Sequence, residues 1–305
     1  MRKPRLPGRK KSAVRDFKYL IAESIAEASS LLAEHGENCR MIAGGTALLL
    51  ALRQRMVAPS HLISLAGIGK LRGITYDEQT GLRIGAMTLH AGVARSPLIQ
   101  KYYPMLADMA GRVANPQVRN QGTIGGNLCY ADPATDPPSC LMALDASVVL
   151  SSTRGERVVA ISDFFIDYYT TALAPDEILA EIRVPRPTFD IGYHARFHRT
   201  AAEHRPLVNL AMTIKRDQDI IRDARFVVGA STTVPTRVKK AEAFLVGKVV
   251  TVPIALQTAE IVAEGIEPIS DIRGSDSFRR DMVRVVAHRT IERLCGLESA
   301  AKNVA

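Results

Sequence analysis

Cysteine is scarce in this sequence, and none of it is arranged to bind a metal. The 305 residues contain four cysteines, Cys39, Cys129, Cys140 and Cys295, which lie far apart and form no C-x-x-C pair. Zinc sites, iron–sulfur sites and disulfide frameworks need closely spaced cysteines. We therefore expect no metal site in this chain and interpret the cysteines as buried free thiols. Cys129 is the exception, because it follows a glycine-rich motif and is a candidate to line a ligand site.

The sequence also lacks a long apolar segment. No run reaches the roughly 18 residues that suggest a membrane-spanning helix. No apolar run follows the basic N-terminus, as a secretory signal requires. We expect a cytoplasmic protein with no membrane span, unless a partner chain carries it elsewhere.

Positive charge is concentrated at the start of the chain. The formal net charge is +9, yet residues 1–18 alone hold eight lysines and arginines against a single acid. We interpret residues 1–13 as a basic arm, either a solvated tail or a docking segment. No basic stripe with interleaved aromatic residues continues beyond it, so the sequence predicts no binding to nucleic acid. With 47% apolar and 23% charged residues, the rest is typical of a globular protein.

Two glycine pairs are the most informative motifs. Ala43-Gly44-Gly45-Thr46 and Thr123-Ile124-Gly125-Gly126-Asn127 lie about 80 residues apart, and each is predicted to be a tight turn after an extended apolar run. Glycine permits positive φ, and successive amides in such turns form concavities that hold anions. Neither pair fits a P-loop, and Gly67, Gly69 and Gly73 have the wrong spacing for a Rossmann fingerprint. The two pairs predict a pincer around the diphosphate of a dinucleotide.

Local patterns predict an α+β protein. Ser24 to Glu27 form a capping box for a helix that ends at Gly36, and Pro185-Arg186-Pro187 is interpreted as a domain boundary. No alternation of strands and helices is evident, which favours α+β over α/β. Strands are predicted at 40–43, 61–65, 71–75, 82–87, 147–151, 157–161, 177–184, 193–198, 210–215 and 224–228. Further helices are predicted at 46–55, 89–94, 105–113, 139–145, 235–245, 253–264 and 278–294.

The segment from Val118 to Asn127, V-R-N-Q-G-T-I-G-G-N, resembles a motif of one family. That family is the FAD-binding subunit of the molybdenum hydroxylases, which includes carbon monoxide dehydrogenase medium subunits and the flavin domain of xanthine dehydrogenase. Further similar landmarks are residues 163–165, 175–179 and 271–275. The resemblance runs from about Val14 to the C-terminal helix.

The resemblance implies a two-lobed PCMH-type FAD-binding domain over 14–187, with lobes at about 14–65 and 66–187. A C-terminal domain over 188–305, with a three-stranded antiparallel sheet and three helices, follows. FAD is expected to be non-covalent, because the first loop lacks the histidine used for covalent attachment. The residues implied to bind FAD are Met41, Ile42, Ala43, Gly44, Gly45, Thr46, Ala47, Val113, Ala114, Thr123, Ile124, Gly125, Gly126, Asn127, Cys129, Tyr130, Thr135, Asp136, Leu173 and His198.

Within this set the resemblance implies separate roles. The loops at Ala43 to Ala47 and at Thr123 to Asn127 would hold the pyrophosphate, and Val113 and Ala114 would line the isoalloxazine face. Cys129 and Tyr130 would lie beside the ring, and Leu173 would lie near its polar edge. Thr135 and Asp136 would lie near the sugar-like chain. His198 stands where some members place a lysine, which leaves its effect on the flavin open.

The resemblance also implies partners. A molybdenum-pterin large subunit would oxidise the substrate, and a small subunit would relay electrons through two two-iron two-sulfur clusters to FAD, with a dimer of heterotrimers as the expected assembly. No catalytic acid or base is then needed in this chain. Two alternatives remain open: a self-sufficient FAD oxidoreductase using Tyr130 or His198, and an assembly module without flavin.

Overall fold

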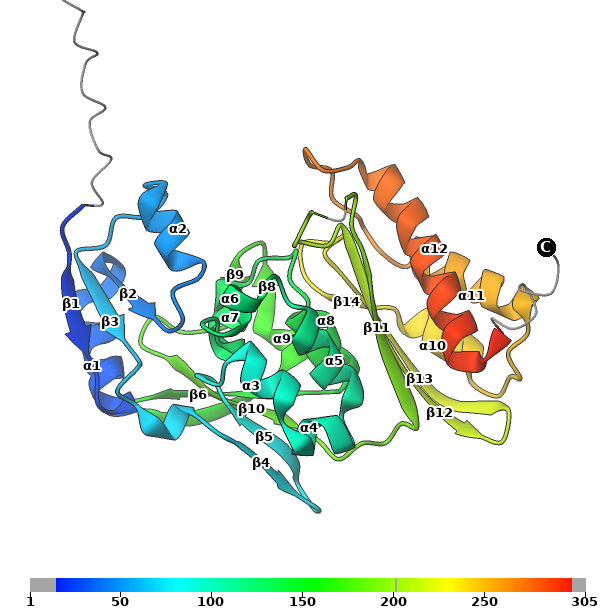
Figure 1. The fold of residues 1–305 in the computed structure, drawn as a ribbon, viewed down its shortest axis with the longest axis horizontal. Coiled ribbons are helices and arrows are strands. Elements are labelled where there is room, and N and C mark those ends of the chain that lie inside the picture. Colours follow the sequence, from blue (N-terminus) through cyan, green and yellow to red (C-terminus); the bar gives the residue numbers. More distant parts are fainter. Residues whose placement is uncertain (1–14, 201, 298–305) are drawn as a thin grey trace, which may run out of the picture.

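The computed structural model describes residues 15–200 and 202–297, so the predicted basic arm lies outside the described residues. Helices and strands form two lobes and a C-terminal domain, arranged side by side (Figure 1). This mixed architecture confirms the predicted α+β class.

The first lobe is built on a parallel sheet in the order β1-β3-β2. Its elements alternate along the chain: β1 (Lys18–Ile21), α1 (Ile25–His35), β2 (Cys39–Ile42), α2 (Leu48–Arg53) and β3 (His61–Ser64). Ser24 caps α1 by accepting from the Glu27 amide, and Gly36 ends it, as predicted. The predicted order of helix, strand, helix and strand is confirmed in this lobe, so the statement that strands and helices do not alternate is wrong here. The strand β1 was missed. Three of the four β1 residues are exposed, so this edge strand carries no burial pattern.

The second lobe contains an antiparallel sheet in the order β4-β5-β10-β6-β7. Leu82, Ile84 and Ile182 of this sheet are fully buried in the largest core, under α5 and α8. The strands are β4 (Ile74–Asp77), β5 (Gly81–Gly85), β6 (Ser147–Ser152), β7 (Gly155–Ala160) and β10 (Ile178–Val184), with a small hairpin of β8 (Phe165–Asp167) and β9 (Thr170–Thr171). The helices are α3 (His90–Arg95), α4 (Pro97–Tyr102), α5 (Pro104–Arg112), α6 (Pro116–Arg119), α7 (Ile124–Tyr130), α8 (Pro137–Ala143) and α9 (Ile161–Phe164).

Two short helices occupy the region in which the sequence suggested breaks. Asn115-Pro116 begins α6, since Asn115 caps the Val118 amide and proline takes the first helical position. The second glycine pair lies in the first turn of α7, which Thr123 caps. The prediction of a tight turn after an extended run is therefore wrong for this pair. The 3₁₀ turn at Gly69–Leu71 agrees with reading the nearby glycines as turn residues.

The C-terminal domain packs three helices against one antiparallel sheet, in the order β11-β12-β13-β14. Thr236 and Arg237 form β14 by pairing with Val228 and Val227 of β13. The sheet thus has a fourth short strand beyond the three predicted, and the helix predicted at 235–245 begins later. The elements are β11 (Ile191–Phe197), β12 (Val208–Asp217), β13 (Ile220–Gly229), β14 (Thr236–Arg237), α10 (Lys239–Leu245), α11 (Val252–Glu264) and α12 (Asp276–Cys295).

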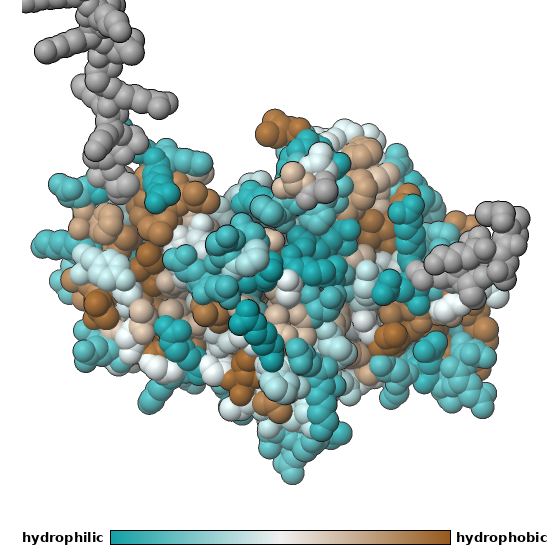
Figure 2. Space-filling view, in the orientation of Figure 1, coloured by the Kyte–Doolittle hydropathy of each residue, from teal (hydrophilic) through white to brown (hydrophobic). Residues whose placement is uncertain are grey.

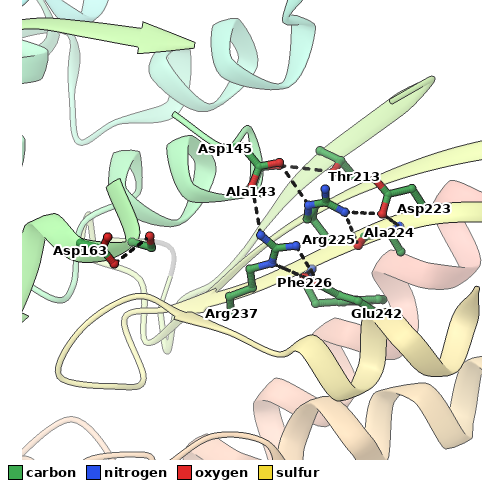
Figure 3. Close-up of polar contacts among 11 residues, drawn as sticks. Ala143, Asp145, Asp163, Thr213, Asp223, Ala224, Arg225, Phe226, Arg237 and Glu242 are labelled. Carbon is green, nitrogen blue, oxygen red and sulfur yellow. Dashed lines mark hydrogen bonds and ion pairs between the residues drawn. The ribbon is translucent and has the colours of Figure 1, made fainter. Parts of the chain in front are cut away.

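An ion-pair cluster ties the C-terminal domain to the second lobe. Arg237 donates to Asp145 at 3.1 Å and to the largely buried Glu242, while Arg225 contacts Asp145 at 3.3 Å (Figure 3). Ala211 and Val227 of the C-terminal sheet belong to the core of the second lobe. The contact between the two parts is therefore both apolar and ionic.

Candidate functional site

The two glycine loops meet. A β-carbon built on Gly44 would lie 2.1 Å from the carbonyl oxygen of Gln121 and 2.8 Å from the Gly122 Cα. A β-carbon on Gly126 would lie 3.5 Å from the Ala43 Cβ. Segments about 80 residues apart in the chain are thus in direct contact, as the pincer hypothesis requires. Figure 2 shows a hollow in the upper outline of the molecule, between the first lobe and the rest of the protein.

The first loop presents a group of free backbone donors. In the part of the chain that the structure describes, the amides of Gly44, Gly45, Thr46 and Ala47 have no hydrogen-bond acceptor. Gly45 has φ of +70°, a conformation that glycine adopts without strain. Just before the loop, Met41 packs into the core of the first lobe, and a methyl carbon of Ile42 lies 3.3 Å from the Cβ position of Gly45. Four neighbouring donors without acceptors fit an anionic group of a ligand.

The second loop is built differently, because its amides are already used. Ile124 donates to the Thr88 carbonyl at 2.9 Å, and Gly125 donates to the Ala86 carbonyl at 2.9 Å. The Gly126 amide donates to the Thr123 hydroxyl at 3.1 Å. The expectation that both loops offer runs of free amides is thus corrected: only the first one does.

The glycines of the second loop are explained by close packing. A β-carbon on Gly125 would lie 2.5 Å from the Ala86 Cβ, so the helix reaches the sheet only with glycine there. What this loop offers a ligand is side-chain chemistry. The buried Oδ1 of Asn127 has no hydrogen-bond partner among the described residues. A buried polar atom without a partner is costly, and a polar ligand group would satisfy it.

Val113 and Ala114 form the turn that ends α5. Ala114 has φ of +43°, which a residue with a β-carbon adopts at a cost. The Arg119 guanidinium holds this turn by donating to the Val113 carbonyl at 2.8 Å and to the Ala114 carbonyl at 3.4 Å. The strained turn is therefore fixed by a side chain that sequence reasoning did not single out.

Cys129, Tyr130 and Leu173 are half-buried residues of the second lobe. Cys129 and Leu173 pack against the same core, and the Tyr130 ring meets the Tyr169 ring edge-to-face with centroids 5.3 Å apart. Burial raises the pKa of the Cys129 thiol to about 12, so the thiol is neutral at physiological pH. Cys129 is thus an apolar packing residue in this fold.

Asp136 is a buried carboxylate that faces the C-terminal domain. It is 3% exposed, and its Oδ1 lies 3.2 Å from the Arg196 Nε and 3.4 Å from the Asn209 Nδ2. Burial raises the pKa of Asp136 to about 6, although Arg196 works in the opposite direction. Thr135 donates its hydroxyl to the Asp132 carbonyl at 2.9 Å. Both predicted sugar-side residues are therefore engaged within the protein.

Two histidines complete the region. The buried Nε2 of His198 has no hydrogen-bond partner among the described residues, and burial, helped by Arg196, lowers the pKa of this ring. His90, which the sequence analysis missed, donates its amide to the Gly122 carbonyl at 3.1 Å and is 2% exposed. A lone histidine at a helix start gives no signal in the sequence; only the fold places it under the second loop.

Comparison with known proteins identifies the class. Residues 15–187 match the family described as the FAD binding domain in molybdopterin dehydrogenase, and residues 194–294 match the CO dehydrogenase flavoprotein C-terminal domain. The chain belongs to this family of FAD-binding flavoprotein subunits.

Individual relatives cover almost the whole chain. The nicotine 6-hydroxylase medium subunit of Paenarthrobacter nicotinovorans is 35% identical over 90% of this chain and 96% of its own length. The carbon monoxide dehydrogenase medium chain of Hydrogenophaga pseudoflava is 31% identical over 90% of this chain and 96% of its own. A chain in the crystal structure of quinoline 2-oxidoreductase from Pseudomonas putida 86 matches with a TM-score of 0.88 at 31% identity, covering 93% of this chain and 98% of that one.

Among the described residues, no helix combines the length and apolar character needed to cross a bilayer. Within residues 15–200 and 202–297, no group of three or more His, Cys, Asp or Glu side chains is placed to hold a metal ion.

Proposed function

We propose that this chain is the FAD-carrying electron-transfer subunit of a molybdenum hydroxylase complex. The observation that carries the proposal is the contact between the two glycine loops, with four free amides on one side of it. Bound FAD can exchange one or two electrons at a time, so it can link a donor and an acceptor that transfer different numbers of electrons. The protein supplies the binding, the orientation and the electrostatic environment of the cofactor. This chain would accept electrons from iron–sulfur clusters of a partner subunit and pass them to an external acceptor.

The residues of this chain would divide the binding of FAD between the two lobes. The amides of residues 44–47 would bind the pyrophosphate, and the buried Oδ1 of Asn127 would accept a hydrogen bond from a donor group of FAD. The Val113–Ala114 turn, Cys129, Tyr130 and Leu173 would surround the ring with mostly apolar side chains. The buried Asp136 would complete the site from the side of the C-terminal domain. No side chain is assigned as a catalytic acid or base.

The proposed partners follow from the names of the relatives. Several are medium subunits or medium chains, names that imply larger and smaller companions. We propose a molybdenum-pterin large subunit and a small subunit with two-iron two-sulfur clusters, assembled as a dimer of heterotrimers in the cytoplasm. The four scattered cysteines of this chain fit such a division of labour, because cluster ligands would then lie on another chain.

The test uses the full chain, purified alone and titrated with FAD. We expect saturable uptake that gives a flavin absorption spectrum, reduction of the bound FAD by dithionite, and no oxidation of aldehydes, purines or N-heterocycles. Turnover of such a substrate by the isolated chain would instead establish a self-sufficient oxidoreductase, and Tyr130→Phe and His198→Gln would then identify the acid or base. A folded chain that takes up no FAD would leave only the assembly module.

A further inference from the structure

Arg196 of β11 joins three segments of the chain that are far apart in the sequence. Its side chain is 9% exposed. One Nη donates to the Arg112 carbonyl at the end of α5, and the other donates to the His204 carbonyl at 2.9 Å. Its Nε lies 3.2 Å from the Asp136 carboxylate. Each partner belongs to a different segment: the α5 turn, the loop after β11, and the start of α8.

The α5 turn is held from both sides by arginines. Arg196 binds the carbonyl of residue 112, and Arg119 binds those of Val113 and Ala114. Arg112 returns the contact by donating to the His194 carbonyl of β11 at 2.6 Å. The last carbonyls of a helix lack partners within the helix and carry partial negative charge, so they favour cations. Arginine suits this role because its donors are held in a rigid fork.

These arginine contacts hold a backbone conformation that is unfavourable in the absence of such contacts. Ala114, with φ of +43°, is held in the left-handed region without glycine's freedom. A strained residue persists only where its surroundings over-determine it. Here the surroundings include a side chain from the other domain.

We infer that Arg196 is a positioning residue for FAD, through which the C-terminal domain holds the Val113–Ala114 turn against the flavin ring. The inference rests on the proposed function, since it requires that this turn faces FAD. Under this inference, the C-terminal domain influences the surroundings of the flavin ring through the position of the turn. Arg196 itself acts through the turn and through Asp136.

Arg237 provides a matched control. It is also an arginine of the C-terminal domain that reaches the second lobe, donating to Asp145 at 3.1 Å, and it pairs with Glu242 (Figure 3). Its partners are distinct from the three segments that Arg196 joins. Arg196→Lys and Arg237→Lys each keep the charge and lose the fork, so both weaken the contact between the domains.

The experiment compares the full-length wild type with both lysine variants. For each protein, the dissociation constant of FAD, the flavin midpoint potential and the melting temperature are measured. We expect Arg196→Lys to raise the dissociation constant at least tenfold and to shift the potential, while Arg237→Lys lowers only the melting temperature. If wild type and Arg196→Lys have the same FAD affinity and the same flavin midpoint potential, the inference is overturned. Arg196 would then serve only to hold the two domains together.

A second variant covers the case in which Arg196→Lys does not fold. Arg196→Gln keeps a polar side chain at this position and loses the contacts to the Arg112 and His204 carbonyls. We expect it to fold and to show the same loss of affinity and a shifted potential, and wild-type values for both would contradict the inference. A wild-type chain that binds no FAD would refute the proposed function, whereas unchanged variants of a chain that binds FAD would refute only the role of Arg196.

Discussion

His90 shows, at the scale of a single residue, how burial changes the chemistry of a side chain. Burial, helped by the nearby Arg119, lowers the pKa of His90 to about 4 from its ordinary value of 6.5. The ring is therefore neutral in the folded protein at physiological pH. In the unfolded chain it would titrate normally, so folding and proton binding are linked.

The expected consequence is a loss of stability in acid. A histidine whose pKa is lowered by folding contributes stability that is present above pH 6.5 and is lost as the pH falls toward 4. The lowered pKa corresponds to about 3 kcal/mol in the free energy of unfolding. Urea unfolding of wild type and His90→Gln at pH 7 and pH 4.5 checks this. The stability of the wild type relative to the variant should fall on acidification, and a constant difference would contradict it.

At the scale of elements, two similar glycine motifs form different structures. The first is an irregular loop with free amides, and the second is the capped first turn of α7, with its amides occupied. In both, glycine allows one backbone to approach another closely. For Gly44 the neighbour is the carbonyl of Gln121, at 2.1 Å from the Cβ position. The close contact between the lobes therefore depends on this glycine.

Gly44→Ala tests the loop contact. The added methyl group would meet a backbone oxygen, so the two loops must separate. We expect FAD affinity to fall at least tenfold and the melting temperature to drop. Gly69→Ala is the control, because its Cβ position has no neighbour within 4 Å and its φ is not positive. It should change neither quantity measurably, and wild-type FAD affinity in Gly44→Ala would show that the loops need not touch.

At the scale of the whole molecule, the second lobe and the C-terminal domain share a packed core and buried ion pairs. Ala211 and Val227 of the C-terminal sheet are fully buried in the core of the second lobe. The buried carboxylates of Asp132 and Asp136 in the second lobe pair with Arg205 and Arg196 of the C-terminal domain. Opening this contact would expose apolar surface and leave buried charges unpaired, which is costly.

We therefore expect the two parts to open together. Native-state hydrogen exchange measures the free energy of opening at individual amides. The amides of Ile182 in β10 and Phe226 in β13, both in fully buried strand residues, should exchange with the same free energy. Mild denaturant should lower both values in parallel. Values that differ by more than about 2 kcal/mol would show that the two parts unfold independently.

Much of the fold was predictable because its signals are local. The capping box at Ser24 and the helices near 253–264 and 278–294 follow from residues adjacent in the chain. The exposed strand β1 and the two-residue strand β14 escaped prediction, since their hydrogen bonds depend on distant partners and not on their own pattern. The choice between turn and helix at the second glycine pair also depended on a neighbour, because Gly125 packs against Ala86.

The sequence by itself determined the family, the α+β class and the two glycine motifs, because these are properties of residue order over short windows. Only the tertiary structure decided which amides remain free, since the acceptors at Thr88 and Ala86 lie on another segment. It also decided that Arg196, Arg119 and His90 surround the site. A polar side chain acquires such a role from the partners that folding brings within hydrogen-bonding distance, and those partners lie up to about 80 residues away along the chain.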